Sequence, residues 1–570
     1  IIDSADAIND YNHAEPWLKK LLNAFADGIN YYLYKNKQTK PALLHRFQPW
    51  YPLLWTDGSI GAINTADVTV EELEKFYSGT STSTGLHKKE TEPELTGSNG
   101  FAFAPSITQS HHSILYINPH VTFYFRPEVQ MVSEEGMNAY GAVTWGQFFI
   151  YQGFNEHCGW MHTSSYVDIA DLYAEKISEK GGKFFYEYEG AVKPVTEKKM
   201  TLNFKEGGVI KTKNINAFYT PHGPVMAKRN GVWLSLKANN RSIDGLIQSW
   251  KRTQSNSFSD FKKTMDIKAN TSNNTVYADA EGNIAYWHGN FMPVRNTKFD
   301  WSKPVDGTTA ATEWKGLHKL DETIQIINPP NGWLQNCNST PFTAAGNMSP
   351  KKEDYPAYMG PDGENFRGIN AVKVLSKETN YTIDKVIAAG YDNYLAAFEK
   401  LIPALTKAFD ENSAKYPALS EPVLVLKNWD MRAAENSVGT ALSVTWGEKL
   451  LPKILQATED YEDIDQITRT ERFAATASAA DLLQPLSDVI DEFKTKYGKW
   501  QTTWGSINRY QRISSDIDQK FNDHASSIPV GFVSSAWGQL PSYTSRYFPG
   551  TNKRYGVNGN SFICAVEFGE

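Results

Sequence analysis

The sequence has only three cysteines among 570 residues, at positions 158, 337 and 564. They lie far apart, their number is odd and no C-x-x-C motif occurs, so we expect neither a disulfide framework nor a cysteine-based zinc site. No apolar run reaches the roughly 18 residues of a membrane span. The chain starts at Ile1 rather than at a methionine, so we expect an earlier segment to be missing and infer no location from the lack of a signal peptide.

The charge balance is mild, with a formal net charge of −7. It gives no basic surface for nucleic acid. Hydrophobic residues make up 41% and charged residues 21%, which is typical of a globular protein. A chain of this length exceeds one ordinary core, so we expect two or more lobes or one large layered domain.

The pattern along the chain changes four times. Helical spacing over 15–35 and 70–77 is followed by a Ser/Thr/Gly-rich and then charged stretch over 79–97, which is typical of a linker or an excised spacer. Strand patterns dominate from 98 onwards, including a hairpin over 274–288. Helical patterns fill 370–500, with helices expected over 391–409, 421–429, 442–456 and 475–493, and a strand closes the chain over 561–568. Strands, a helical block and a final strand predict a layered α+β fold.

Ser98 stands directly after the spacer, in the run G-S-N-G-F-A-F-A over 97–104. A serine that becomes a new N-terminus carries its own base, because an α-amine has a pKa of roughly 7.7–8 and is partly neutral near pH 7 to 8. That amine can take the hydroxyl proton without a separate histidine. Alone, however, a serine after glycine is most often a turn residue.

Further motifs follow in a fixed order. They are I-N-P-H over 117–120, G-W-M-H-T-S over 159–164 with D-I-A-D-L-Y over 168–173, and N-N-T-V-Y-A-D over 273–279 with G-N-I-A-Y over 282–286. Together with the spacer and the Ser98 run, this set resembles the penicillin acylase family of N-terminal-nucleophile hydrolases. The resemblance covers most of the chain.

The resemblance implies an architecture and a processing event. Residues 1–78 are similar to the late part of the family's α subunit, 79–97 to its spacer and 98–570 to its β subunit, so self-cleavage is expected to give an α/β heterodimer. The implied fold is the four-layer αββα sandwich with a helical insert over about 370–500. A periplasmic or secreted location, a small-molecule N-acyl substrate and no cofactor for the chemistry are further implications.

The resemblance also implies site residues. Ser98 matches the nucleophile and Gly97 the residue before the cleaved bond. His120 would orient the Ser98 hydroxyl and amine, and Asn274 with the backbone N–H of Ser164 would bind the oxyanion. The remaining matches are Arg295 as a brace for the asparagine and the amine, Val121, Phe148 and Phe149 near the acyl pocket, and Asp168, Ala170 and Asp171 as part of a site for one structural calcium ion.

Simpler interpretations stay open for these residues. Asn274 could merely start a hairpin, with Asn273 as an alternative, and Asp168 and Asp171 could be solvated turn carboxylates or helix caps. For the whole chain, two other classes remain: an inactive relative that binds acyl or aromatic ligands, and a structural or cell-surface module in which 79–97 is a flexible linker.

Overall fold

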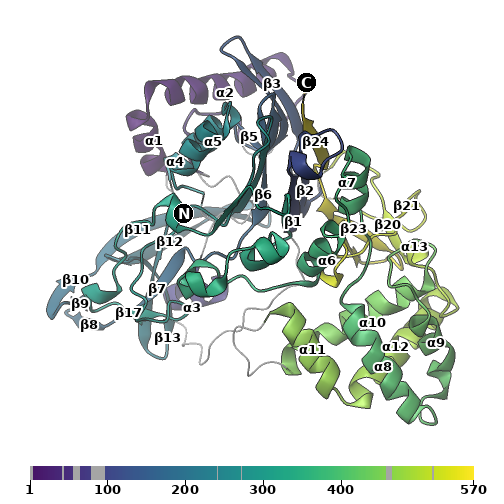
Figure 1. The fold of residues 1–570 in the computed structure, drawn as a ribbon. Coiled ribbons are helices and arrows are strands. Elements are labelled where there is room, and N and C mark those ends of the chain that lie inside the picture. Colours follow the sequence, from purple (N-terminus) through teal and green to yellow (C-terminus); the bar gives the residue numbers. More distant parts are fainter. Residues whose placement is uncertain are drawn as a thin grey trace.

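Two β-sheets lie face to face at the centre of the protein, and helices cover the outer face of each (Figure 1). The structure is a computed structural model that describes residues 4–41, 44–54, 65–78, 97–240, 242–270, 273–457, 465–516 and 519–569. The predicted α+β class and the αββα layering are confirmed.

The first sheet begins with the strand that carries Ser98. In spatial order its strands are β19 (Trp333–Asn336), β1 (Gly97–Phe103), β2 (Ser113–Thr122), β23 (Arg554–Asn560), β20 (Asn508–Tyr510) and β21 (Ile528–Pro529), with β22 (Tyr543–Tyr547) beside β23 and β24 (Cys564–Phe568) beside β2. β1 therefore has a strand on each side, and it runs antiparallel to both.

The second sheet packs against the first. Its strands are, in order, β18 (Gln325–Ile327), β16 (Ile284–Trp287), β15 (Asn273–Asp279), β6 (Cys158–Ser164), β5 (Ile150–Asn155), β4 (Met137–Val143) and β3 (Glu128–Ser133). The sheets meet closely at Gly100, where a Cβ would stand 2.9 Å from Cγ of Met161 and 3.0 Å from Cγ2 of Val276. A side chain at that position would push the two sheets apart.

Helices close both outer faces. α4 (Ile243–Thr253) and α5 (Phe258–Met265) lie on the second sheet, where Phe261 packs with Trp160 and Trp287. α6 (Phe366–Leu375) and α7 (Ile383–Gly390) lie on the first sheet, where Leu375 packs with Tyr116. Strand alternation separates these cores, because neighbouring residues of β1 and β2 point to opposite faces.

A helical lobe follows these layers, as expected for the insert (Figure 1). It consists of α8 (Phe398–Asn412), α9 (Ser420–Lys427), α10 (Val438–Ala457), α11 (Gln466–Thr476) and α12 (Ala479–Tyr497), with the short α13 (Trp504–Ile507) after them. The helix boundaries differ from the sequence prediction by up to seven residues. α8 starts seven residues after 391, at Phe398. The helix expected over 475–493 is α12, which starts at Ala479 because the Ser478 side chain accepts a hydrogen bond from the Asp481 N–H and caps it; residues 475–476 end α11.

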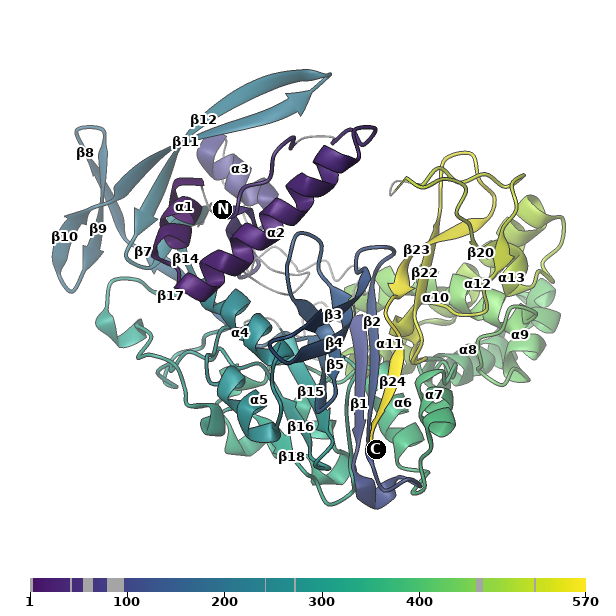
Figure 2. The ribbon, with the colours of Figure 1, turned by 90° about the horizontal axis from the view of Figure 1, so that it is seen from above.

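A further β lobe extends from the opposite side of the sandwich (Figure 2). One sheet contains β11 (Thr196–Glu206), β12 (Val209–Thr220), β13 (Gly223–Arg229), β14 (Val232–Ala238), β7 (Ala170–Glu175) and β17 (Val305–Asp306), and a smaller one contains β10 (Ala191–Pro194), β9 (Lys183–Tyr188) and β8 (Ile177–Lys180). β7 continues from the end of β6, so this lobe is joined directly to the second sheet.

The first part of the chain packs onto the remainder through three helices. α1 (Ser4–His13) and α2 (Pro16–Lys35) bury Ala7, Leu18 and Leu22 against Leu246 of α4. α3 (Val70–Ser78) contacts β13 through a hydrogen bond from the Tyr77 hydroxyl to the Val225 carbonyl at 2.8 Å. Of the predicted spacer, 79–96 lies outside the described residues, and Gly97 is the first residue of β1. In the described residues, no helix is both long and apolar enough to cross a membrane.

Candidate active site

Ser98 lies at the head of β1 and is 5% exposed. Its backbone N–H donates to Oδ1 of Asn338 at 2.6 Å. Its hydroxyl donates to the carbonyl oxygen of Gly97, the residue before it. The candidate nucleophile is therefore buried, and its hydroxyl lies beside the peptide that self-processing would break.

Two residues absent from the sequence prediction surround Ser98. Arg367 donates through Nη1 to the Ser98 carbonyl at 2.6 Å and to Oδ1 of Asn99 at 2.8 Å, and through Nη2 to Oδ1 of Asn338 at 2.8 Å. Asn338 in turn donates through Nδ2 to the Ser164 carbonyl at 2.8 Å. Arg367 and Asn338 thus fix the backbone on both sides of the Ser98 Cα.

Local sequence explains how these two residues reach Ser98. Asn338 follows β19 with a φ of 58°, a left-handed conformation that asparagine tolerates better than most residues. Asn365 caps α6 by accepting from the Gly368 N–H at 2.8 Å and donates to the Asn338 carbonyl at 3.0 Å. Gly368 permits this close approach, since a Cβ there would stand 2.5 Å from Cβ of Ser339. The first turn of α6 therefore presents Arg367 to β1.

His120 lies directly across from Gly97 in the β1–β2 register. Directly opposed residues share a face, so the His120 side chain points to the α6 side of the sheet, with Asn99 and away from the Ser98 side chain. Both ring nitrogens are buried without a hydrogen-bond partner. Burial lowers the pKa of His120 well below its usual value, and the positive charge of Arg367 lowers it further. The ring is therefore neutral.

Asn274 is linked to Asn338 through two acceptors that they share, the Ser164 carbonyl and Oδ1 of Asn336. Its Nδ2 donates to Oγ1 of Thr163 at 3.1 Å, to Oδ1 of Asn336 at 3.3 Å and to the Ser164 carbonyl at 3.4 Å. β15 and β6 pair Asn273 with Ser164 and Asn274 with Thr163. The structure thus brings Asn274 and Ser164 together as the sequence predicts, and both belong to the network that contains Asn338.

Arg295 contacts other groups. Its Nε donates to Oδ2 of Asp171 at 2.8 Å, its Nη1 to the Asp168 carbonyl at 2.8 Å, and its Nη2 lies 3.3 Å from Oδ1 of Asp168. The guanidinium also lies over the rings of Tyr358, Trp301 and Trp314 at 5.1, 5.6 and 5.8 Å. In this structure Arg367 donates to the Ser98 carbonyl and to Asn338, whereas the role of Arg295 as a brace stays a prediction.

This arrangement tests whether Asp168, Ala170 and Asp171 fit a calcium ion. Calcium takes six to eight oxygen ligands. Arg295 already takes both carboxylates and a carbonyl of the segment, which leaves Oδ1 of Asp171 as a buried oxygen without a hydrogen-bond partner. Among the described residues, no group of three or more acidic, histidine or cysteine side chains is placed to hold a metal. With Arg295 bound to it, this donor set does not fit calcium. The calcium ion itself stays a prediction of the resemblance.

The three predicted acyl-pocket residues divide into two groups. Val121 is 2% exposed on β2, two residues from Pro119, which pairs with Ser98, so it shares the Ser98 face of the sheet. Phe148 and Phe149 pack in the cluster with Leu18 and Leu246, against the first part of the chain. Val121 is therefore the predicted pocket residue that shares the face of the nucleophile.

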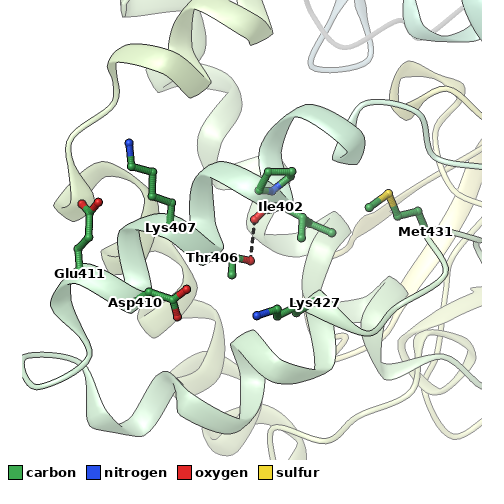
Figure 3. Close-up of a pocket in the computed structure, with 8 residues that line it drawn as sticks. Ile402, Thr406, Lys407, Asp410, Glu411, Lys427 and Met431 are labelled. Carbon is green, nitrogen blue, oxygen red and sulfur yellow. Dashed lines mark hydrogen bonds between the residues drawn. The ribbon is translucent and has the colours of Figure 1, made fainter.

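A separate hollow lies on the helical lobe, with a volume of about 490 Å³ (Figure 3). Its lining comes from α8, α9 and the turn after α9: Ile402, Pro403, Thr406, Lys407, Asp410, Glu411, Lys427 and Met431. The Thr406 hydroxyl is bonded back to the Ile402 carbonyl at 2.9 Å. None of these residues contacts the Ser98 network, so the hollow is not part of the candidate active site.

The fold has a counterpart among solved structures. The structure is similar to that of the thermostable penicillin G acylase from Alcaligenes faecalis, with a TM-score of 0.57 and 17% identity, over 82% of this chain and 88% of that one. This likeness shows the N-terminal-nucleophile hydrolase fold. The sequence matches the family described as penicillin amidase over residues 2–570. The chain therefore belongs to the penicillin amidase family.

Named relatives fall into two groups. Penicillin G acylase of Escherichia coli is 26% identical over 46% of this chain and 30% of its own length. The acyl-homoserine lactone acylase QuiP of Pseudomonas fluorescens is 26% identical over 42% and 30%. The acyl-homoserine lactone acylase PvdQ of Pseudomonas syringae pv. tomato is 22% identical over 83% and 64%. The matches thus span under a third of the length of the first two relatives.

Proposed function

We propose that this chain is a self-processed amide hydrolase that cleaves N-acyl amides through an acyl-enzyme on Ser98. The observation that carries the proposal is the position of Ser98. It is a buried serine at the head of an inner strand, with its hydroxyl on the Gly97 carbonyl and its nitrogen held by Asn338. Family membership makes this position the expected one for a nucleophile.

Processing would exchange a peptide for an ester. Oγ of Ser98 attacks the carbonyl carbon of Gly97, the bond from that carbon to the Ser98 nitrogen breaks, and the nitrogen receives the hydroxyl proton. Water then hydrolyses the ester. The products are a carboxylate at Gly97 and a free amine at Ser98, so the same hydroxyl serves processing and catalysis.

In catalysis the free amine acts as the base. It takes the Oγ proton while Oγ attacks the amide carbonyl of the substrate, and that proton leaves with the departing amine. Water then releases the acyl group by the same route. The nearby charge of Arg367 lowers the pKa of the amine, because a neighbouring positive charge favours its neutral form. No cofactor is required by these steps.

Two asparagines are candidates for stabilising the oxyanion. The sequence favours Asn274 with the Ser164 N–H, whereas contact with the Ser98 nitrogen favours Asn338. Removing one oxyanion donor costs on the order of 100–1,000-fold in rate. We therefore expect Asn338→Ala to lose more activity than Asn274→Ala, and the opposite order would restore the assignment made from the sequence.

The two products of cleavage are proposed to remain together as an α/β heterodimer. α2 buries Leu18 and Leu22 against α4 and β5, and each buried leucine contributes roughly 1.5–3 kcal/mol. α3 adds its contact with β13. A periplasmic or secreted location stays a prediction of the family resemblance.

The first test is the mass of the purified protein. We expect wild-type protein to contain a fragment that begins at Ser98, and Ser98→Ala to stay at the full 64.1 kDa. Ser113→Ala is the matched control, because Ser113 is a buried serine on the next strand and donates to the Asp279 carbonyl. An uncut wild-type chain that hydrolyses no amide but binds acyl ligands would favour the alternative of an inactive binding protein.

The second test defines the substrate. A series of N-acyl 4-nitroanilides from acetyl to dodecanoyl, with phenylacetyl added, reports the acyl preference through released 4-nitroaniline. N-acyl homoserine lactones and β-lactam amides are then compared at the preferred acyl group. Since Val121 presents a short β-branched side chain on the Ser98 face, we expect a linear acyl chain to be preferred to phenylacetyl.

A further inference from the structure

A buried hydrogen-bond chain extends from the Ser98 network to a His–Asp pair. Its centre is Asn336 at the end of β19, which is fully buried. Oδ1 of Asn336 accepts from Oγ1 of Thr163 at 2.5 Å, from the backbone N–H of Asn338 at 2.9 Å and from Nδ2 of Asn274 at 3.3 Å. The orientation of this one amide therefore affects both asparagines considered for catalysis.

The other end of the Asn336 amide leads away from Ser98. Its Nδ2 donates to the Ser339 carbonyl at 3.1 Å and to the Tyr286 hydroxyl at 3.3 Å. The Tyr286 hydroxyl lies 2.9 Å from Nδ1 of His288. Nε2 of His288 lies 3.0 Å from Oδ2 of Asp362, and both side chains are fully buried. The two atoms are not aligned as a hydrogen bond, so the hydrogen-bond chain ends at His288 and the carboxylate acts on its ring through charge.

The backbone N–H of Asn338 sets which atom donates and which accepts at each step of this hydrogen-bond chain. A backbone N–H can only donate, so the Asn338 N–H makes the accepting atom of Asn336 its oxygen and leaves Nδ2 to donate. The Tyr286 oxygen accepts that hydrogen bond and gives its own proton to Nδ1 of His288. His288 then carries its proton on Nε2, facing the Asp362 carboxylate. Burial raises the pKa of Tyr286 well above its usual value, so the hydroxyl keeps its proton.

We propose that Tyr286, His288 and Asp362 are positioning residues that fix the amide of Asn336 and, through it, those of Asn338 and Asn274. This inference rests on the proposed function of Ser98 for its effect on rate. The negative charge of the carboxylate 3.0 Å away favours the histidine tautomer with its proton on Nε2, and that tautomer leaves Nδ1 as an acceptor for Tyr286. Asp362 is further held by the Tyr166 N–H, which donates to Oδ1 at 2.8 Å.

Two buried tyrosines on adjacent strands provide a test variant and its matched control. Tyr286→Phe removes the hydroxyl that links Asn336 to His288. Tyr277→Phe removes an equally buried hydroxyl from the partner strand β15, where it donates to Oδ2 of Asp279 at 2.9 Å, outside this network. Tyr286→Phe loses the two hydrogen bonds of a buried hydroxyl and Tyr277→Phe loses the one to Asp279, so both melting temperatures should fall by a few degrees.

The rates should separate the two variants. Per mole of chain cut at Ser98, we expect Tyr286→Phe to lower kcat for 4-nitroanilide hydrolysis about tenfold or more with little change in KM, and to slow processing. Tyr277→Phe should retain the wild-type kcat. Equal rates for the two variants would overturn the proposal.

A second measurement does not depend on activity. In protein with ¹⁵N-labelled histidine, we expect the His288 signal, assigned by its loss in His288→Gln, to show a proton on Nε2. Asp362→Asn should weaken that preference while leaving the fold intact. A His288 proton on Nδ1 in wild-type protein would sink the inference. If the wild-type chain is neither cut nor active, the proposed function fails, and the tautomer still tests the hydrogen-bond chain.

Discussion

Arg367 and Arg295 are both buried in this protein, at 1% and 4% exposure. The two side chains differ in the charge of the groups that they contact. Arg367 donates to a carbonyl and to two amide oxygens around Ser98. Arg295 donates to two carboxylates at the start of the β lobe. The residue types are identical, so their surroundings decide what each one does.

The difference indicates separate roles. A guanidinium bonded to neutral oxygens keeps its positive field where negative charge would develop on the substrate, which is the condition for electrostatic catalysis. A guanidinium between two carboxylates has its positive charge neutralised by them. In this position Arg295 links the segment after Ser164 to the loop after β16. We therefore propose that Arg367 serves the reaction proposed for Ser98 and that Arg295 stabilises the β lobe.

The largest expected effect is on the reaction rate of Arg367→Lys, and Arg295→Lys serves as the comparison. Arg367→Lys keeps the charge but loses the planar fork that reaches Ser98, Asn99 and Asn338 together, so we expect kcat to fall roughly 100-fold or more, the size expected for losing a preorganised donor. Arg295→Lys should change kcat per cut molecule less than threefold. Initial rates on the best 4-nitroanilide measure both, and equal losses would erase the distinction between the two arginines.

A smaller effect concerns stability. Arg295→Met leaves the buried Asp171 carboxylate and the partly exposed Asp168 carboxylate without their cation, and breaking a buried ion pair in this way costs about 3–5 kcal/mol. Arg295→Met with Asp171→Asn removes one of the charges and should regain part of that loss. Urea unfolding of unprocessed Ser98→Ala protein measures the series without interference from cleavage.

A further experiment tests whether the segment of Asp168 and Asp171 binds calcium. We expect EGTA to leave the melting temperature of wild-type protein unchanged, because Arg295 already supplies the positive charge. A clear fall with EGTA, reversed by added calcium, would restore the metal site implied by the resemblance.

The smallest expected effect is a pH dependence. The pKa of His120 is lowered in the folded state, so the unfolded chain binds a proton there that the folded chain does not. His120 therefore reduces stability progressively as pH falls below the ordinary histidine value of about 6.5. His120→Gln should unfold with a weaker pH dependence between about pH 7 and 5. Identical slopes for both proteins would mean that folding does not lower the pKa of His120.

Much of this site was accessible from the sequence, for physical reasons. The spacer and the run over 97–104 drew attention to Ser98, because a loss of core-forming residues followed directly by a strand pattern is visible in one dimension. The later motifs and the resemblance they carry then implied its role as nucleophile. The layered fold and the helical lobe followed from hydrophobic periodicity. Helix ends were less certain, since a cap such as Ser478 is a single residue within a helical pattern.

The sequence analysis did not find Asn338 and Arg367, for a different reason. Asn274 sits in a strong hairpin pattern, whereas Asn338 sits in W-L-Q-N-C-N-S-T-P over 333–341, an apolar strand that ends in polar residues. That ending was the available signal. Only the register of β1 with β19 and the approach of α6 place Asn338 and Arg367 at Ser98, and neither follows from spacing.

The inner position of β1 has a consequence for a chain that is cut after Gly97. New chain ends ordinarily fray, and a terminal amine samples many positions. Here the new end would begin next to β2 and, from Gly100 onwards, between two paired strands. The sheet would thus convert a chain terminus, usually the least ordered part of a protein, into a fixed point. Nucleophile and base would share one residue whose conformational freedom folding has already removed.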